Sequence, residues 1–269
     1  TDTRKIFRRK ASALPVPDGL TASNYAIDTR GSGASYMRVN QSTDLLLSTG
    51  DMTWSFWFYP TVIPSGEAGF FKPNGGTLSV WCYLREVAQK MAIGLRGSGG
   101  TVYAYGDTTP TVNKWNLATL SWDYSSETVK IYMNGREETV TKTGTSGALS
   151  GNFDDFIFFS NTTTGSEDLD GYVAEVAMWE DYWSDDTNHD ALWNSYNQST
   201  NAGGKSCNDL GTTLNNKLRY FFTGEYANTT GDVILNQATG TDSESAIKGT
   251  PTNLSRLDGG NTWVEKGTA

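Results

Sequence analysis

The chain has 269 residues, enough to bury the core of one large β-domain or of two small ones. Its 13 Tyr, 11 Phe and 9 Trp favour strands, and its 29 Gly supply turns. A formal net charge of −9 disfavours binding of the domain body to nucleic acid or an anionic membrane, and no run of apolar residues is long enough to predict a membrane span.

The first 23 residues are interpreted as a basic N-terminal arm and linker. Prolines at 15 and 17 favour an extended linker over residues 14–19, and no apolar stretch of the kind found in a signal peptide follows the basic charges. Such an arm is either a solvated tail or a segment that binds an acidic partner surface or a neighbouring subunit. We predict the second, a protein partner in a larger assembly. The cations of the arm are Arg4, Lys5, Arg8, Arg9 and Lys10.

Short β-strands then follow one another along residues 24–240, which we predict to be one domain. Turns rich in Gly, Pro and Asn separate them by about 8–12 residues, the spacing of a β-sandwich or barrel. The 52–59 strand is apolar on both faces and should be central. Residues 241–269 are expected to form a C-terminal surface segment. The expected strands are 35–39, 52–59, 69–72, 77–84, 90–96, 101–105, 155–160, 171–180 and 217–222, with a meander at 115–135.

One short helix is expected before the last of these strands. Ser184–Asp186 can cap its start and place acidic groups near the positive end of the helix dipole. An apolar stripe follows at Leu192, Trp193 and Tyr196. Gly203–Gly204 should end the segment.

The stretch 115–135 carries the clearest structural signal. Two runs alternate with period two, so each is expected to be a half-buried strand with successive side chains on opposite faces. Turn-forming residues at 123–127 separate the runs, and Asn134–Gly135 can adopt the positive φ angles of a tight turn. The residues expected to share a face are Trp115, Leu117, Thr119 and Ser121 in the first run, and Val129, Ile131 and Met133 in the second.

The same stretch resembles a known family. Trp115-x-Leu-Ala-Thr, an acidic turn at Asp123 and Val-Lys-Ile-Tyr-Met-Asn-Gly at 129–135 are similar to the central signature of laminin-G-like domains of the concanavalin A-like lectin/glucanase superfamily. Gly-Tyr-Val-Ala-Glu-Val-Ala-Met-Trp at 171–179, followed by a Ser-led helix, resembles the end of such domains. The resemblance spans about residues 35–240. It implies an all-β fold, an antiparallel β-sandwich of jelly-roll type with one short helix. It leaves function open, because this scaffold hosts lectins, enzymes, adhesion modules and virion proteins.

Glycoside hydrolysis needs two carboxyl groups that flank the scissile bond, and glucanases of this superfamily place theirs at alternate positions of one strand. Glu167–Asp170 has the wrong spacing and order for this, and Glu137–Glu138 is expected to be a solvated pair on a hairpin. Glu175 and Glu180 should point to opposite faces of their strand. His189, the single histidine, is expected at the surface or in helix packing rather than in a catalytic triad. We therefore predict that the protein is not an enzyme.

The resemblance also implies a possible Ca²⁺ site, since laminin-G-like domains often hold Ca²⁺ at a rim of the sandwich with Asp side chains and carbonyl oxygens. These are ligands that this hard cation prefers. Acidic residues in the segments on either side of the 155–160 strand could converge there, and solvated loop acids are the alternative. The candidate ligands are Asp154, Asp155, Glu167, Asp168 and Asp170.

Sugar binding would use exposed aromatic rings that stack on a pyranose face, with polar groups around them. Most aromatic residues of a sandwich belong to its core, which is the alternative for each residue taken alone. The candidates are Trp81, Tyr103, Tyr105, Tyr124 and Trp183.

The two cysteines, Cys82 and Cys207, match no metal-binding spacing. They are expected to be unpaired thiols in a core, and a disulfide across the fold is the alternative.

Two non-catalytic functions remain. The favoured hypothesis is a virion assembly component, a capsid-decoration or fibre-type subunit of a bacteriophage, because it accounts for the basic arm. The alternative is a secreted, Ca²⁺-dependent carbohydrate-binding or adhesion module, which binds surface glycans outside the cell. Neither hypothesis requires a membrane, and nucleic acid is disfavoured as a partner.

Overall fold

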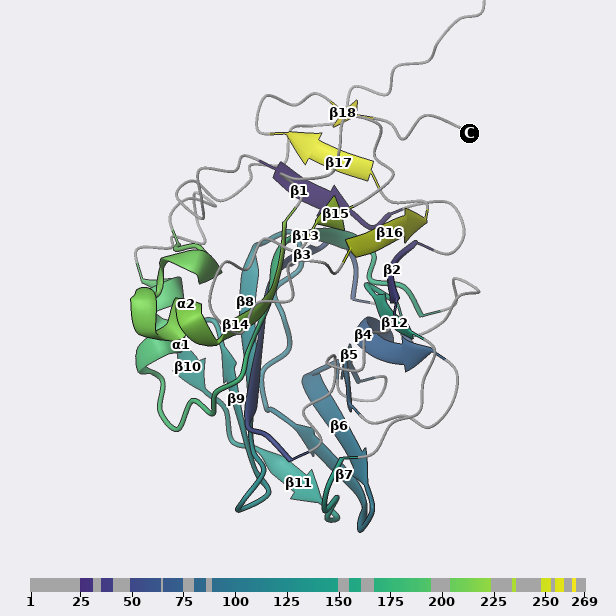
Figure 1. Cartoon of the computed structure of the whole chain (residues 1–269). Coiled ribbons are helices and arrows are strands. Elements are labelled where there is room, and N and C mark those ends of the chain that lie inside the picture. The colour runs from purple at the N-terminus through teal and green to yellow at the C-terminus, as the bar shows by residue number, and fades with distance from the viewer. Residues whose placement is uncertain are drawn as a thin grey trace, which may run out of the picture.

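The computed structural model folds the chain into two stacked β-sheets with helices on one side (Figure 1). The structure describes residues 25–30, 35–40, 49–63, 65–74, 80–85, 89–149, 155–160, 167–194, 204–223, 234–235, 248–252, 255–258 and 263–264. The predicted basic arm and linker, residues 1–23, therefore lie outside the described residues.

All strand pairs within the two sheets are antiparallel, which confirms the predicted antiparallel β-sandwich. Sheet 1 runs in the order β10 (Arg136–Glu137), β9 (Thr128–Met133), β8 (Asn116–Asp123), β3 (Met52–Pro60), β13 (Gly171–Trp179), β1 (Tyr25–Asp28), β17 (Ser255–Asp258) and β18 (Trp263–Val264), with β14 (Leu218–Thr223) also paired to β13. Sheet 2 runs in the order β11 (Thr141–Thr143), β7 (Gly100–Tyr105), β6 (Met91–Gly97), β5 (Val80–Leu84), β4 (Ala68–Asn74), β12 (Asp155–Phe158), β2 (Tyr36–Asn40), β16 (Lys248–Thr252) and β15 (Ile234–Leu235).

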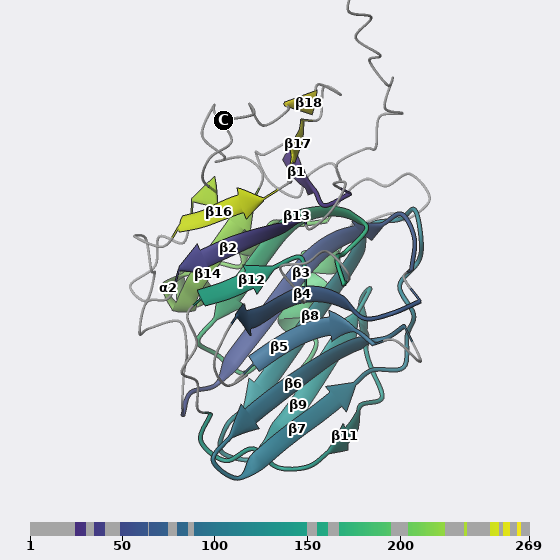
Figure 2. The ribbon, with the colours of Figure 1, turned by 90° about the vertical axis from the view of Figure 1, so that its right-hand side faces the viewer.

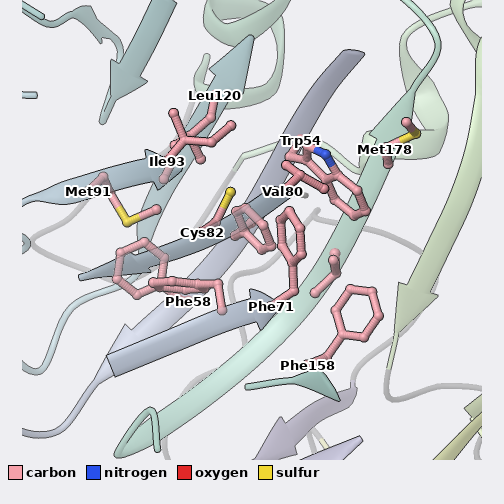
Figure 3. Packing of buried hydrophobic residues seen from close by; sticks show 14 of the residues in the cluster. Trp54, Phe58, Phe71, Val80, Cys82, Met91, Ile93, Leu120, Phe158 and Met178 are labelled. Carbon is pink, nitrogen blue, oxygen red and sulfur yellow. The ribbon is translucent and has the colours of Figure 1, made fainter. Parts of the chain in front are cut away.

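Side chains from the facing surfaces of the two sheets form the main hydrophobic core (Figure 3). Trp54 of β3 stacks on Phe71 of β4 with ring centroids 4.1 Å apart, a contact that joins sheet 1 to sheet 2. Phe58 of β3 meets Phe70 of β4 edge to face at 4.8 Å. Neighbours Phe70 and Phe71 both enter this core because the pairing of β4 with β5 shifts register between Gly69 and Phe71.

The predicted 115–135 meander is β8 and β9, but β8 is buried on both faces rather than one. Leu120 and Trp122 point into the core between the sheets, whereas Leu117 packs on the other surface of sheet 1. The prediction of a half-buried strand was wrong for β8, because helices cover that second surface. The predicted tight turn is confirmed, with φ of 54° at Asn134 and 77° at Gly135.

Chain beyond residue 240 also contributes strands to the sandwich. β16 pairs with β2 in sheet 2, and β17 pairs with β1 in sheet 1. The part of the sequence expected to be a surface segment thus includes strands of both sheets.

The described residues contain two α-helices and a 3₁₀ turn, where the sequence predicted one helix. α1 spans Thr187–Trp193 and ends at Asn194, so it is shorter than expected, and the side chain of its N-cap residue Asp186 makes no capping hydrogen bond. Tyr196 lies outside the described residues. η1 (Cys207–Asp209) and α2 (Thr212–Lys217) were not predicted, because they are too short to show an apolar period.

These helices cover the outer surface of sheet 1, the surface that faces away from sheet 2 (Figure 1). A second hydrophobic cluster fills the space beneath them, in which Trp57 of β3 stacks on Trp193 of α1 at 5.8 Å. Leu192 of α1 and Leu218 of β14 are fully buried in the same cluster. Sheet 2 differs, since no helix of the described chain lies over its outer surface (Figure 2). Among the described residues, the outer surface of sheet 2 thus lacks the helical layer that covers sheet 1.

Cys82 of β5 and Cys207 of η1 are both buried free thiols, as the sequence favoured. Neither α-helix in the described part of the chain has the length and apolar character that crossing a membrane would require.

His189 lies fully buried between α1 and sheet 1, which confirms a helix-packing role. Its Nδ1 is 2.9 Å from Oγ1 of Thr119, and its Nε2 accepts the N–H of Gly135 at 3.0 Å. An Nε2 that accepts a hydrogen bond carries no proton, so the ring is neutral. Burial lowers the pKa of His189 to about 3.

Glu175 of β13 is a second buried titratable group beneath the helices. Its Oε2 accepts the backbone N–H of Cys207 at 2.8 Å, which fastens η1 to the outer surface of sheet 1. Burial raises the pKa of Glu175 to about 8, because the charged carboxylate loses its hydration there.

Replacing Glu175 by Gln should change how stability depends on pH. Between pH 4.5 and about 8 the native state holds a proton that the unfolded state has released, so stability falls as pH rises through this window. The amide does not titrate. We expect the free energy of unfolding of Glu175→Gln, relative to the unsubstituted protein, to rise by about 1.4 kcal/mol per pH unit across the window. Urea unfolding at a series of pH values measures this, with the exposed Glu137→Gln as control. A difference that stays constant with pH would contradict the assignment.

Candidate functional site

Three of the five predicted sugar-binding aromatics lie together on the outer surface of sheet 2. Trp81 belongs to β5, and Tyr103 and Tyr105 belong to β7. Tyr83 of β5 joins them, because alternate residues of a strand point to the same face. We call these four side chains the aromatic patch.

The strand register arranges the aromatic patch in two rows that run across β5, β6 and β7. In each row, a small residue of β6 lies between a ring of β5 and a ring of β7. The order of these three strands can be followed in Figure 2. Both rows continue onto the edge strand β11 with a threonine, Thr143 in the first and Thr141 in the second. The first row is Trp81, Gly94 and Tyr103, and the second is Tyr83, Ala92 and Tyr105.

The indole of Trp81 lies directly on the backbone of Gly94. A Cβ atom at residue 94 would lie 2.1 Å from Cε2 of Trp81, so no larger residue fits beneath the ring. Tyr103 meets the indole edge to face, with ring centroids 5.7 Å apart and an interplanar angle of 75°. Trp81 is 8% exposed and Tyr103 47% exposed. The covered indole thus supports an exposed ring beside it.

A cation lies at one end of the second row. The guanidinium carbon of Arg85 is 4.2 Å from the ring centroid of Tyr105, a cation–π distance. The backbone N–H of Arg85 donates to the carbonyl of Lys90 at 2.9 Å, which closes the β5–β6 connection. Hydrogen bonds from Arg85 and Thr141 lower the pKa of Tyr105, whereas burial raises the pKa of Tyr83 to about 12.

Tyr83, Arg85 and Gly94 were not predicted from the sequence to belong to this surface. Period two in Val-Trp-Cys-Tyr-Leu at 80–84 already places Tyr83 on the same face as Trp81. A glycine inside a strand often marks a close approach by another group, which is the role of Gly94 beneath the indole.

Trp183 and Tyr124, the other two predicted sugar-binding residues, belong to the sheet 1 side of the sandwich. Trp183 is 2% exposed, with its ring 4.8 Å from that of Trp179 in the cluster beneath the helices. It offers no surface on which a sugar could stack, so this candidate was wrong. Tyr124 is half-buried against the main core.

Of the predicted Ca²⁺ ligands, the structure describes three side chains, and they have separate roles. Asp168 Oδ2 accepts the N–H of Ser35 at 2.8 Å, and Asp170 Oδ1 accepts the hydroxyl of Thr61 at 2.8 Å. The third, Glu167, is half-buried. Asp154 and the side chain of Asp155 lie outside the described residues.

No group of three or more Asp, Glu, His or Cys side chains suited to a metal gathers in the described ranges. Ca²⁺ takes six to eight oxygen ligands, and the side chains of Asp154 and Asp155 that could complete such a set lie outside the described residues. Ca²⁺ binding stays a prediction.

The acidic pair expected to be solvated on a hairpin has one buried member. Glu138 is 5% exposed, and its Oε2 accepts the backbone N–H groups of Asp107 and Thr108 at 2.8 and 2.5 Å. Its Oε1 faces the guanidinium of Arg136 at 2.9 Å. The prediction of solvation was therefore wrong for Glu138, which holds the 107–108 segment in place, and right for the exposed Glu137.

Comparison with known proteins places this fold in a family. The sequence model of the concanavalin A-like lectin/glucanases superfamily matches residues 31–187, more than half of the chain. The chain belongs to this superfamily. The matched range runs from β2 through β13, so the whole aromatic patch lies inside the concanavalin A-like part of the chain. No curated protein sequence matches it.

Several solved structures resemble this concanavalin A-like domain at low sequence identity. A candidate carbohydrate-binding protein from Bacteroides ovatus matches with a TM-score of 0.59 and 14% identity, over 88% of this chain and 60% of its own. A heptameric SAP-like pentraxin from Limulus polyphemus matches with a TM-score of 0.48 and 11% identity, over 62% of this chain and 80% of its own. The CBM40 of a Ruminococcus gnavus IT-sialidase matches with a TM-score of 0.42 and 14% identity, over 58% of this chain and 93% of its own. At these identities the likeness concerns the fold.

Replacing Gly94 by Ala should displace the Trp81 indole, because the new Cβ would overlap it. We expect a loss of about 1–3 kcal/mol in the free energy of unfolding and a changed near-UV circular dichroism signal. Gly66→Ala is the matched control, since nothing lies within 4 Å of a Cβ at that position. Unchanged stability and spectrum in Gly94→Ala would show that Trp81 does not rest on Gly94.

Proposed function

We propose that this concanavalin A-like domain is a non-catalytic carbohydrate-binding module that holds a saccharide against the aromatic patch. The observation that carries the proposal is the exposed ring of Tyr103, fixed in place by the covered indole of Trp81. A pyranose presents an apolar C–H face that packs on an aromatic ring, and a ring that is already held loses little freedom when it binds.

The surroundings of Tyr103 suit a sugar. Thr141 and Thr143 are exposed on β11 beside the two rows, and Thr101 lies next on β7. Hydroxyl groups both donate and accept hydrogen bonds, so they can pair with sugar hydroxyls around the stacked ring. Among the described side chains, Tyr103 is the most exposed aromatic residue, which favours this surface over the rest of the sandwich.

The absence of catalysis is part of the proposal. Glu175 is covered by the helices, and Glu138 is buried in hydrogen bonds to backbone groups, so neither is placed to act on a substrate at the surface. Glu180 forms an ion pair with Arg219. Each of these three carboxylates therefore has a partner within the protein.

The proposal reverses the order of the two hypotheses drawn from the sequence. Membership in a lectin/glucanase superfamily and the likeness to a candidate carbohydrate-binding protein both support sugar binding. No comparison points to a virion, and the basic arm that favoured the assembly hypothesis lies outside the described residues. The assembly role and the virion location stay predictions.

Replacing Tyr103 by Ala should weaken glycan binding without unfolding the protein, because about half of its side chain is exposed. A printed glycan array identifies the bound saccharide, and calorimetry with that saccharide should show a loss of about tenfold or more in affinity. Tyr182→Ala, which removes a half-buried tyrosine on the sheet 1 side, is the matched control. The proposal fails if no glycan binds, or if Tyr103→Ala binds as the unsubstituted protein does.

A further inference from the structure

The strands that carry the aromatic patch are free of acidic residues. β4, β5, β6, β7 and β11 contain no Asp or Glu, in a chain that has 30 of them. On these strands Lys72 and Arg96 have the outward parity, whereas Lys142 is paired with the core residue Ala104 and has the inward parity. Glu67, just before β4, is an acid whose charge adds to burial in raising the pKa of Tyr83. The outward charged residues of these five strands are thus cations, in a protein whose net charge is negative.

β6 places cations at both ends of the patch. Lys90, just before β6, and Arg96 within it share the outward parity of Ala92 and Gly94. The outward residues along this segment are therefore Lys90, Ala92, Gly94 and Arg96, with a cation at each end and two small residues between them. At about 3.3 Å per residue, the two cations are about 20 Å apart along the strand, with the aromatic rings between them.

A third cation is fixed beside Lys90. The backbone hydrogen bond between Arg85 and Lys90 places both at the same end of the patch, and Tyr105 holds the guanidinium by a cation–π contact. Within the described residues, no carboxylate lies at salt-bridge distance from Arg85, Lys90 or Arg96. Arg96 is exposed, and the other two are half-buried. Glu86, which lies between Arg85 and Lys90 in the sequence, is outside the described residues. The exposed Arg96 is the most accessible of the three cations.

The opposite side of the sandwich has the opposite charge. The segment at 180–190, which leads into α1 over sheet 1, has five acids and one histidine that is neutral in the buried state. Glu180 and Asp181 are paired with Arg219 and Lys217, so Asp185, Asp186 and Asp190 carry the remaining negative charge of this segment. These charges disfavour a polyanion on this side of the molecule. The acids of this segment are Glu180, Asp181, Asp185, Asp186 and Asp190.

We propose that the ligand of the aromatic patch is an anionic saccharide, whose carboxylate or sulfate groups pair with Arg85, Lys90 and Arg96 while a sugar ring stacks on Tyr103. This inference rests on the proposed function and narrows it to one class of glycan. Guanidinium groups suit both anions because their planar fork can donate two parallel hydrogen bonds.

A saccharide fits this surface better than a nucleic acid strand. Single-stranded nucleic acids bind along a series of exposed aromatic platforms, one for each stacked base. Here Trp81 and Tyr83 are covered, at 8% and 6% exposed, and Tyr103 is the ring that projects.

The test compares pairs of probes that share a backbone and differ in charge. Oligogalacturonate is measured against its methyl ester, and dextran sulfate against dextran, by calorimetry at low and high NaCl. We expect one of the two acidic probes to bind about tenfold or more tightly than its neutral partner, with affinity falling as salt rises. Binding of oligogalacturonate would indicate that the surface recognises carboxylate groups, and binding of dextran sulfate that it recognises sulfate groups.

Arg85→Gln and Arg96→Gln should each weaken that binding by about tenfold, while Lys205→Gln, an exposed cation near η1, should leave it unchanged. Thermal unfolding confirms that each variant is folded, and Arg96→Gln serves alone if Arg85→Gln is not. The inference is overturned if both folded variants bind normally, if the neutral probe binds as well as the acid, or if an oligothymidylate binds more tightly than either acidic probe. Neutral binding that Tyr103→Ala abolishes would leave the proposed function standing, whereas no binding of any glycan would remove both.

Discussion

The arrangement of this domain depends on covering sheet 1 on both of its faces. β3, β8 and β13 are buried along nearly their whole length, since they face sheet 2 on one side and the helices on the other. Burial of apolar area is the main favourable contribution to folding, so the second cluster requires α1, η1 and α2 where they are. The apolar side chains of the helices are thus packed against sheet 1. No helix of the described chain covers the outer surface of sheet 2, and the aromatic patch of the proposed binding site lies there.

On that open surface, the smallest side chains determine where the largest ones lie. Gly94 and Ala92 leave room for rings from β5 and β7 to rest on the sheet, so the rings are held before any ligand arrives. Pre-organisation of this kind lowers the entropy lost on binding. A patch of exposed, mobile rings would instead bind less selectively and favour aggregation.

Local pattern predicted much of this structure, and contacts between distant segments account for what it missed. The strands of the sandwich and the Asn134–Gly135 turn follow from period two and from turn chemistry. Trp81, Tyr103 and Tyr105 were chosen by residue type, but their meeting depends on strand register. Trp183 was misjudged because only the folded chain shows what covers it. The prediction that Glu138 is solvated failed for the same reason, since its hydrogen-bond partners lie about 30 residues away in the chain.

Glu175 and His189 lie beneath the same helices, and burial acts on them in opposite directions. As pH falls below 6.5, His189 becomes protonated in the unfolded state but stays neutral in the native state until about pH 3. The free energy of unfolding therefore decreases as pH falls through this range. As pH rises above 4.5, the unfolded glutamate releases a proton that the buried one keeps until about pH 8, so stability is lost on that side. Between pH 4.5 and 6.5 the two contributions to the pH dependence of the free energy of unfolding have opposite signs and cancel. The sum of their contributions to the free energy of unfolding therefore stays constant through mild acidification. The contribution of either group alone would change with pH over the same range.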